Sequence, residues 1–239
     1  MTPTWILERD NPELQLRRIS LDCRCRLLSI LVEADIRGRI CADQTDLLER
    51  LELFKVLSGE LGLLNQPARF ASDAGRYLYF QERWHLPDQA PYEDFRCRVV
   101  MLSGLPGAGK DTWASRHYSD WPVISLDEIR EKMGVSPTEP QGAVVDAARK
   151  LAREHLRKRQ NFVWNATNIS AQMRQKPLGL FLEYGAHVTI VYLEAPRGKL
   201  MSQNRNREAV VPAAVMERLI RKWEIPSPTE AHQVEHVAQ

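Results

Sequence analysis

Residues 99–112 read Val-Val-Met-Leu-Ser-Gly-Leu-Pro-Gly-Ala-Gly-Lys-Asp-Thr. The apolar run at its start predicts a buried β-strand, and the glycine-rich segment after it predicts a loop that leaves this strand. Glycines permit backbone dihedrals that residues with a Cβ resist, so successive N–H groups can point inward around a polyphosphate. A lysine at the loop's end adds positive charge for the β- and γ-phosphates, and the following helix directs its positive end to the same place. The stretch therefore predicts a nucleotide-binding loop, formed by Gly104, Gly107, Ala108, Gly109, Lys110, Asp111 and Thr112.

Asp111 occupies the position at which such loops usually carry Ser or Thr, whose hydroxyl binds Mg²⁺. A carboxylate there can hold Mg²⁺ directly or through water, and Thr112 can then reach an α-phosphate. The alternative is that Asp111 lies in the first helical turn, where negative charge is favourable. The sequence leaves both interpretations open.

Composition points to a globular protein without a membrane partner. The 239 residues are 44% hydrophobic and 27% charged, which is ordinary for a globular chain. No apolar run approaches the length of a membrane span, and the first residues do not resemble a secretory signal. The four cysteines show no zinc-ligand spacing, so we expect reduced thiols and a cytoplasmic protein.

The chain divides by charge and by pattern near residue 97. Residues 1–97 carry 13 basic and 16 acidic residues, whereas residues 98–239 carry 20 and 15. Apolar periodicity in the first part predicts helices over 14–32, over 70–84 and between Asp43 and Asn65. The Pro-containing stretch 86–91 predicts a linker. We expect a small helical domain over 1–95 and a second domain over 98–239.

From residue 98 onward, short apolar runs alternate with longer helical stretches. This alternation predicts an α/β fold, in which a parallel sheet carries helices on both faces and binds ligands at the carboxyl ends of its strands. The expected strands are 99–102, 123–126, 162–164, 188–193 and 234–237, and the expected helices are 110–118, 141–159, 170–184 and 212–223.

The ends of the second and third strands offer further candidates. Asp127 follows the second strand, where its carboxylate can accept a proton from an attacking hydroxyl, and Arg130 shares its helical face and can bind a substrate phosphate. The alternative is that Asp127 caps the helix after it. Asn165 ends the third strand, where many phosphate-loop enzymes have a metal-binding Asp. In one interpretation the neutral amide of Asn165 cannot supply that charge, so Asp111 binds the metal. In the other, Asn165 only hydrogen-bonds backbone groups at a turn.

Two arginines precede Pro212. Arg205 and Arg207 resemble a lid that closes over phosphates and neutralises charge in the transition state, although a solvated basic loop would show the same pattern.

Together these pieces resemble the P-loop 5′-hydroxyl polynucleotide kinases of phage and bacterial end healing. The resemblance covers about residues 98–239 and rests on Gly104–Thr112, Asp127 to Arg130, 166–168 and the Arg205–Arg207 segment. It implies ATP and Mg²⁺ as cofactors and nucleic-acid 5′-hydroxyl ends as substrate. It also implies that Lys110 binds ATP phosphates, that Asp127 activates the hydroxyl, that Arg130 holds a neighbouring phosphate, and that a lid arginine acts on the transferred group.

The first part resembles another family. Leu31-Val32-Glu33-Ala34-Asp35-Ile36-Arg37-Gly38 is similar to the last segment of an HD phosphohydrolase domain, in which the Asp is a metal ligand. The chain has no His-Asp dipeptide, and Asp35 alone cannot assemble such a site. We therefore expect no hydrolase activity, and we expect the apolar helix faces to be buried on the other domain or in a homo-oligomer.

Three functions remain open at this point. The first is an ATP-dependent kinase for the 5′-hydroxyl of RNA or DNA. The second is a P-loop kinase for a small molecule or nucleotide. The third is a nucleotide-binding regulatory module that binds a partner without transferring phosphate.

Overall fold

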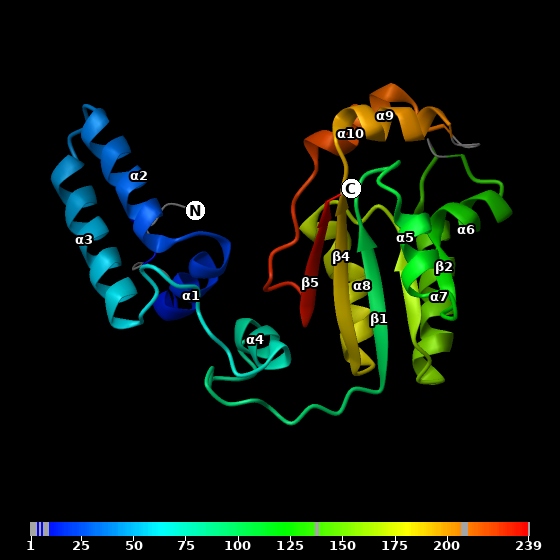
Figure 1. The fold of residues 1–239 in the computed structure, drawn as a ribbon, viewed down its shortest axis with the longest axis horizontal. Coiled ribbons are helices and arrows are strands. Elements are labelled where there is room, and N and C mark those ends of the chain that lie inside the picture. Colours follow the sequence, from blue (N-terminus) through cyan, green and yellow to red (C-terminus); the bar gives the residue numbers. More distant parts are fainter. Residues whose placement is uncertain (1–3, 5, 7–9, 137–138, 207–209, 239) are drawn as a thin grey trace. The chain divides into compact units, whose positions relative to one another are not determined.

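The computed structural model describes residues 4, 6, 10–136, 139–206 and 210–238. The chain divides into two compact units, Met1–Pro91 and Tyr92–Gln239. The first unit is helical and the second contains the sheet (Figure 1).

The described residues of the first unit form four α-helices. They are α1 (Pro12–Asp22), α2 (Cys25–Gly38), α3 (Gln44–Glu60) and α4 (Asp73–Phe80). The expectation of one continuous helix over 14–32 is wrong, because the backbone is extended at Cys23, with φ −155° and ψ 161°. This break lets α1 and α2 change direction and bury residues of both helices in one core, which includes Leu16, Ile19, Cys25 and Ile36.

Side chains cap two of these helices. Asn11 accepts a hydrogen bond from the Leu14 backbone N–H at the start of α1, and Ser72 accepts one from the Gly75 N–H at the start of α4. Such caps satisfy N–H groups that the first helical turn leaves without partners.

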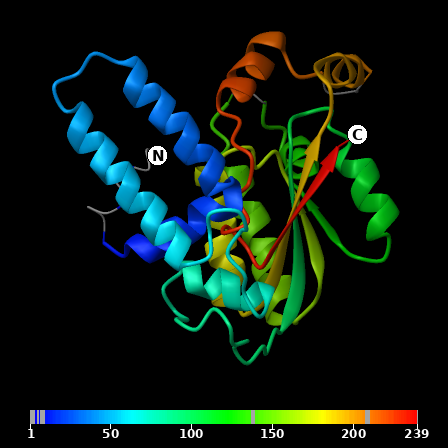
Figure 2. The same cartoon turned by 60° about the vertical axis from the view of Figure 1, so that its left-hand side comes forward.

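The second unit contains a five-stranded parallel sheet in the order β2-β3-β1-β4-β5. The strands are β1 (Cys97–Ser103), β2 (Val123–Ser125), β3 (Phe162–Asn165), β4 (Ala186–Glu194) and β5 (Gln233–Ala238). The helices between them are α5 (Lys110–His117), α6 (Leu126–Lys132), α7 (Gly142–Arg157), α8 (Ala171–Glu183), α9 (Arg197–Arg205) and α10 (Ala213–Arg221). Figure 2 shows helices on either side of this sheet.

The alternation of side chains along the strands builds two cores. On one face, Val99 and Met101 of β1 pack in a cluster with Ala148 of α7 and Phe181 of α8. On the other face, Val100 and Leu102 pack in a cluster with side chains of α5 and α9, which include Trp113 and Leu200. Successive strand residues point to opposite faces, so both faces of β1 are buried. The α/β prediction, with a parallel sheet between two helical layers, is confirmed.

Helix α9 was not expected from the sequence, which suggested a loop ahead of Pro212. Among the described residues, no helix is both long and apolar enough to cross a lipid bilayer.

Candidate nucleotide and phosphoryl-transfer site

The strand ends bring the predicted residues to one edge of the sheet. Ser125 of β2 pairs with Asn165 of β3, and Asn165 pairs with Leu102 of β1, so these three residues form one row across the sheet. The glycine-rich loop starts two residues beyond this row in β1, and Asp127 lies two residues beyond it after β2. Carboxyl ends of parallel strands are where α/β folds place ligands.

Two glycines are required by close backbone packing. Gly104 has φ +153°, and a Cβ there would lie 2.6 Å from the Leu193 carbonyl oxygen. Gly107 has φ +80°, and its Cβ would lie 2.8 Å from the carbonyl oxygen of Leu200 in α9. A side chain at either position would press on backbone atoms that cannot rotate away. The loop is therefore held between β4 and α9.

The loop passes directly into α5. Gly109, with φ +81°, is the N-cap residue, and Lys110 begins the helix. The Lys110 ammonium donates to the carbonyl oxygens of Gly104 and Leu105, at 3.0 and 3.1 Å. These contacts place the positive charge of Lys110 over the loop. The loop N–H groups and the N-terminus of α5 also favour an anion there.

Asp111 and Asn165 meet although 54 positions separate them in the sequence. The Asn165 amide donates to Asp111 Oδ1 at 2.5 Å. One carboxylate oxygen of Asp111 is used in this contact. Mg²⁺ usually binds through one or two carboxylates together with substrate phosphates. The pair fits that role, and no cluster of three or more His, Cys, Asp or Glu ligands occurs in the part of the chain that the structure describes.

Asp127 is not the cap of α6. The cap residue is Ser125, whose Oγ accepts a hydrogen bond from the Glu128 N–H at 3.3 Å. Asp127 lies in the first turn with its side chain 57% exposed, and its Oδ1 lies 2.6 Å from Nη2 of Arg130. The alternative interpretation of Asp127 as a helix cap is therefore wrong, and its carboxylate faces solvent beside a guanidinium.

Arg130 has a second partner that fixes its orientation. Its Nε donates to Oε1 of Gln141, the N-cap residue of α7, at 2.9 Å. The Gln141 amide in turn donates to the carbonyl oxygens of Ser136 and Glu139. The guanidinium is thus held between α6 and the start of α7, with its side chain 25% exposed.

The end of α9, where the sequence analysis predicts a lid, contains a buried residue that the sequence analysis did not select. Asn204, buried at the end of α9, donates to the Val211 carbonyl oxygen at 2.8 Å and accepts from the Val211 N–H at 3.1 Å. This two-way pairing ties the last turn of α9 to Val211, which lies just before α10; both helices are labelled in Figure 1. Arg205 is exposed at the last turn of α9, and Arg207 lies outside the described residues.

A buried arginine connects the segment after β3 with the segment after α10. Arg174 of α8 is fully buried and forms a two-point ion pair with Glu230, at 2.6 and 2.8 Å. Its Nη1 also donates to the carbonyl oxygens of Asn168 and Glu224. Asn168 has φ +44° and donates to the Leu102 carbonyl oxygen at 2.7 Å, immediately before the phosphate loop.

Arg174 thus ties the base of the loop to the segment that follows α10. The four acceptors satisfy most N–H donors of the buried guanidinium, and loss of the Glu230 carboxylate would leave an uncompensated buried charge. Nothing in the local sequence marks it, because its acceptors lie 6 to 56 positions away.

Tyr192 lies beside the same edge, because it pairs with Ser103 at the end of β1. Burial raises the pKa of Tyr192 to about 12, so its phenol stays protonated at neutral pH. It is therefore not a candidate base.

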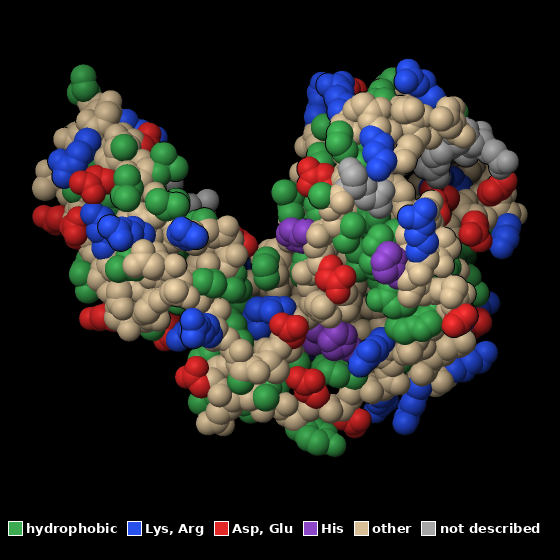
Figure 3. Space-filling model, viewed as in Figure 1, with side chains coloured by type: hydrophobic (Ala, Val, Ile, Leu, Met, Phe, Trp, Pro, Cys, Tyr) green, Lys and Arg blue, Asp and Glu red, His purple; other side chains and the backbone are tan. Residues whose placement is uncertain are grey.

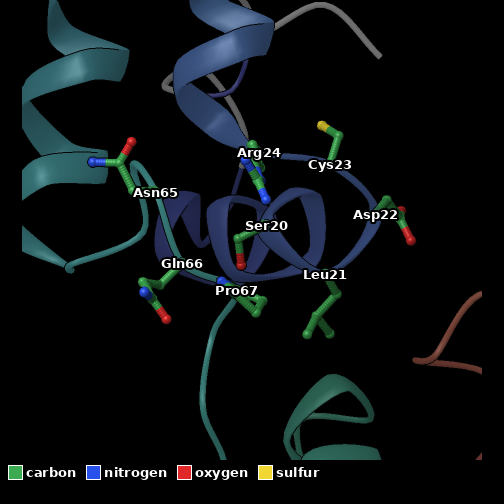
Figure 4. Close-up of a pocket in the computed structure, with 8 residues that line it drawn as sticks. All are labelled: Ser20, Leu21, Asp22, Cys23, Arg24, Asn65, Gln66 and Pro67. Carbon is green, nitrogen blue, oxygen red and sulfur yellow. The ribbon is translucent and has the colours of Figure 1, made fainter.

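Elsewhere, the helical unit has a surface hollow of about 370 Å³ at the end of α1 (Figure 4). It is lined by Ser20, Leu21, Asp22, Cys23, Arg24, Asn65, Gln66 and Pro67, none of which belongs to the predicted site. In the same unit, Asp35 is exposed and pairs with Arg39, its Oδ2 lying 2.5 Å from Nη2.

Three known proteins are similar to part of this chain. An L-seryl-tRNA(Sec) kinase of Methanococcus maripaludis is 25% identical over 136 residues, which cover 54% of this chain and 53% of that protein. A protein from Chloroflexus aurantiacus, assigned as a kinase, superposes with a TM-score of 0.51 at 17% identity over 60% of this chain and 86% of its own. A chain of the Pnkp1/Rnl/Hen1 RNA repair complex superposes with a TM-score of 0.48 at 19% identity. The match covers 57% of this chain and 46% of that chain.

The chain spans about half the length of the seryl-tRNA kinase that it matches. The model of the AAA domain family matches residues 99–226, which contain the phosphate loop, both strand ends and the two arginines of the predicted lid. The chain therefore belongs to the AAA domain family and has a P-loop kinase-like fold.

Proposed function

We propose that this protein is an ATP-dependent kinase that transfers the γ-phosphate to the 5′-hydroxyl end of RNA or DNA. The observation that carries the proposal is the Asp127–Arg130 pair on α6. It provides a carboxylate and a guanidinium side by side, at the same edge of the sheet as the phosphate loop.

The carboxylate of Asp127 suits a general base. It is exposed, and Ser125 performs the capping role that would otherwise explain an Asp at this position. In the proposed reaction Asp127 takes the proton of the substrate hydroxyl, whose oxygen then attacks the γ-phosphorus. The bond from the γ-phosphorus to the bridging oxygen breaks, and ADP leaves.

Other residues bind the charged groups. Lys110 and the loop N–H groups hold the β- and γ-phosphates, and Arg205 and Arg207 neutralise the transferred group from the lid. Asp111, held by Asn165, would hold Mg²⁺, which reduces the repulsion between ATP and the acceptor.

Arg130 favours an acceptor that carries its own phosphate. A guanidinium binds phosphate through two parallel N–H donors, which a neutral sugar hydroxyl does not match. In a nucleic-acid end, the phosphate next to the 5′-nucleoside would lie within reach of such a group. The net charge of +5 over residues 98–239, from 20 basic and 15 acidic residues, also suits a polyanion.

A second candidate acceptor comes from the relative in Methanococcus maripaludis, which is named as a kinase of L-seryl-tRNA. That name places the hydroxyl on an amino acid attached to RNA. For this chain the same residues would act, but the accepting oxygen would be the seryl hydroxyl instead of a ribose 5′-oxygen.

Transfer of labelled γ-phosphate from ATP tests these acceptors side by side. The panel contains 5′-hydroxyl RNA, 5′-hydroxyl DNA, the same strands with a 5′-phosphate as matched blanks, seryl-tRNA, nucleosides and sugars. We expect label on the 5′-hydroxyl strands and none on the blanks. Label on seryl-tRNA or on small molecules alone would contradict the polynucleotide proposal. Tight ATP binding without transfer to any acceptor would instead indicate a regulatory module.

A further inference from the structure

Helix α2 of the helical unit has two apolar faces. One face contributes Cys25 and Ile36 to the core. The other face carries Leu27, Ile30 and Leu31, which are 60%, 56% and 67% exposed, and the exposed Ala34. Positions 27, 30, 31 and 34 follow the i, i+3, i+4, i+7 spacing of one helical stripe. We call these four residues the α2 stripe. Figure 3 shows hydrophobic side chains on the surface of the region of α2 and α3.

Such a stripe is unusual on a protein surface. Scattered apolar residues are normal, but a row of three large aliphatic side chains more than half exposed marks an interaction site. Burying the exposed part of each side chain would favour association. Such a stripe can pack against a second helix, whose side-chain ridges would fit between its own.

Two charged residues beside the stripe bear on which helix could fit. Arg26 and Glu33 lie seven positions apart, so they flank the stripe on the same side, two turns from each other. Within the described part of the chain Arg26 forms no ion pair. Glu33 already pairs with Arg37 and Lys55, at 2.9 and 2.8 Å, so Arg26 of a second copy would join this existing cluster of charges.

An antiparallel two-fold contact would pair these residues. The midpoint between positions 26 and 33 falls between Ser29 and Ile30, and the midpoint of the α2 stripe lies at Ile30 and Leu31. A two-fold axis perpendicular to α2 at this place would set Arg26 of one copy opposite Glu33 of a second copy, twice. The same axis would pack the two stripes against each other, as an isologous interface requires.

We propose that this face is a self-association surface, on which α2 of a second copy of the chain packs antiparallel. The helix has 14 residues, or about four turns. One helix pair gives an interface at the small end of the specific range, so the dimer should be reversible and depend on concentration.

Sedimentation equilibrium over a wide range of protein concentrations tests this proposal on the full chain. We expect a monomer–dimer equilibrium that Ile30→Lys shifts to monomer. Leu53→Lys is the matched control, since Leu53 is 53% exposed on α3 and lies outside the α2 stripe. It should leave the equilibrium unchanged. A wild-type chain that stays monomeric at every concentration would overturn the proposal, as would equal loss of the dimer in both variants.

The register can be tested by disulfide formation. In a Cys23→Ser background, Ile30→Cys lies next to the proposed axis and should form an intermolecular disulfide under mild oxidation. Leu27→Cys lies away from the axis and should form much less. Arg26→Glu should weaken the dimer at low salt and lose that effect at high salt. Preferential cross-linking through position 27, or an Arg26→Glu variant that dimerises more tightly, would contradict the antiparallel arrangement.

Discussion

The phosphate loop and helix α6 lie at the same edge of the sheet but are built in different ways. The loop is made of backbone, and its glycines at 104 and 107 lie where any Cβ would press on a carbonyl oxygen. Helix α6 presents side chains, with Asp127 and Arg130 joined by one exposed ion pair. A loop made of backbone can bind polyphosphate in any P-loop protein. Exposed side chains such as those of α6 can differ between proteins that act on different acceptors. The difference suggests that the loop provides the common chemistry and α6 the choice of acceptor.

The largest effect should come from the loop's charge. Lys110→Ala should abolish phosphoryl transfer, because the β- and γ-phosphates would lose their fixed cation. Label transfer from ATP measures this, with circular dichroism as the control for folding. Near-native turnover in Lys110→Ala would mean that the loop is not the working nucleotide site.

Gly107→Ala should also act on the nucleotide side. The added methyl group would press on the Leu200 carbonyl in α9, and the φ of +80° is strained for alanine by about 1–3 kcal/mol. We expect weaker ATP binding by calorimetry and lower stability. Gly142→Ala is a control, since a Cβ there meets nothing within 4 Å. Equal behaviour of the two variants would contradict the tight packing of loop and α9.

Arg130→Ala should affect binding of the acceptor and not of ATP, because Arg130 is proposed to bind a phosphate of the acceptor. We expect a KM for oligonucleotide that rises roughly ten- to a hundred-fold, the loss of a hydrogen bond to a charged group, while the KM for ATP changes little. The effect should shrink for nucleoside acceptors, which lack the adjacent phosphate. Equal losses for both kinds of acceptor would reject this role for Arg130.

The smallest effect should come from the helical unit. Asp35→Ala should leave the kinase rate unchanged, because Asp35 makes only an exposed ion pair with Arg39. The purified protein should also release no phosphate from 2′,3′-cyclic phosphate ends in Mn²⁺ or Ni²⁺. Metal-dependent release that disappears in Asp35→Ala would reveal a working hydrolase site.

Local patterns predicted the parts of this fold that depend on neighbours in the sequence. The glycine spacing identified the loop. The three-residue separation of Asp127 and Arg130 predicted that they share a helical face, and in the structure Asp127 Oδ1 lies 2.6 Å from Arg130 Nη2. The sequence did not reveal Ser125 as the cap, since Asp127 is an equally good capping residue by type.

Residues with distant partners were missed. Arg174 binds Glu230, which lies 56 positions away. Asn204 pairs with Val211, seven positions away, where α9 ends, and the sequence did not predict α9. The break between α1 and α2 was missed as well, because Cys23 and Arg24 carry no Gly or Pro signal. In each case tertiary packing decides a structure that local propensity leaves undetermined.

The central claim is that Asp127 serves the reaction and Ser125 serves the helix. Turnover per folded molecule and unfolding free energy, measured together on Asp127→Asn and Ser125→Ala, test this most directly. We predict that Asp127→Asn lowers turnover by about 10²-fold or more, with ATP binding nearly unchanged. Ser125→Ala should cost about 1 kcal/mol of stability and keep its turnover. An Asp127→Asn variant that loses stability but keeps its turnover would contradict the claim.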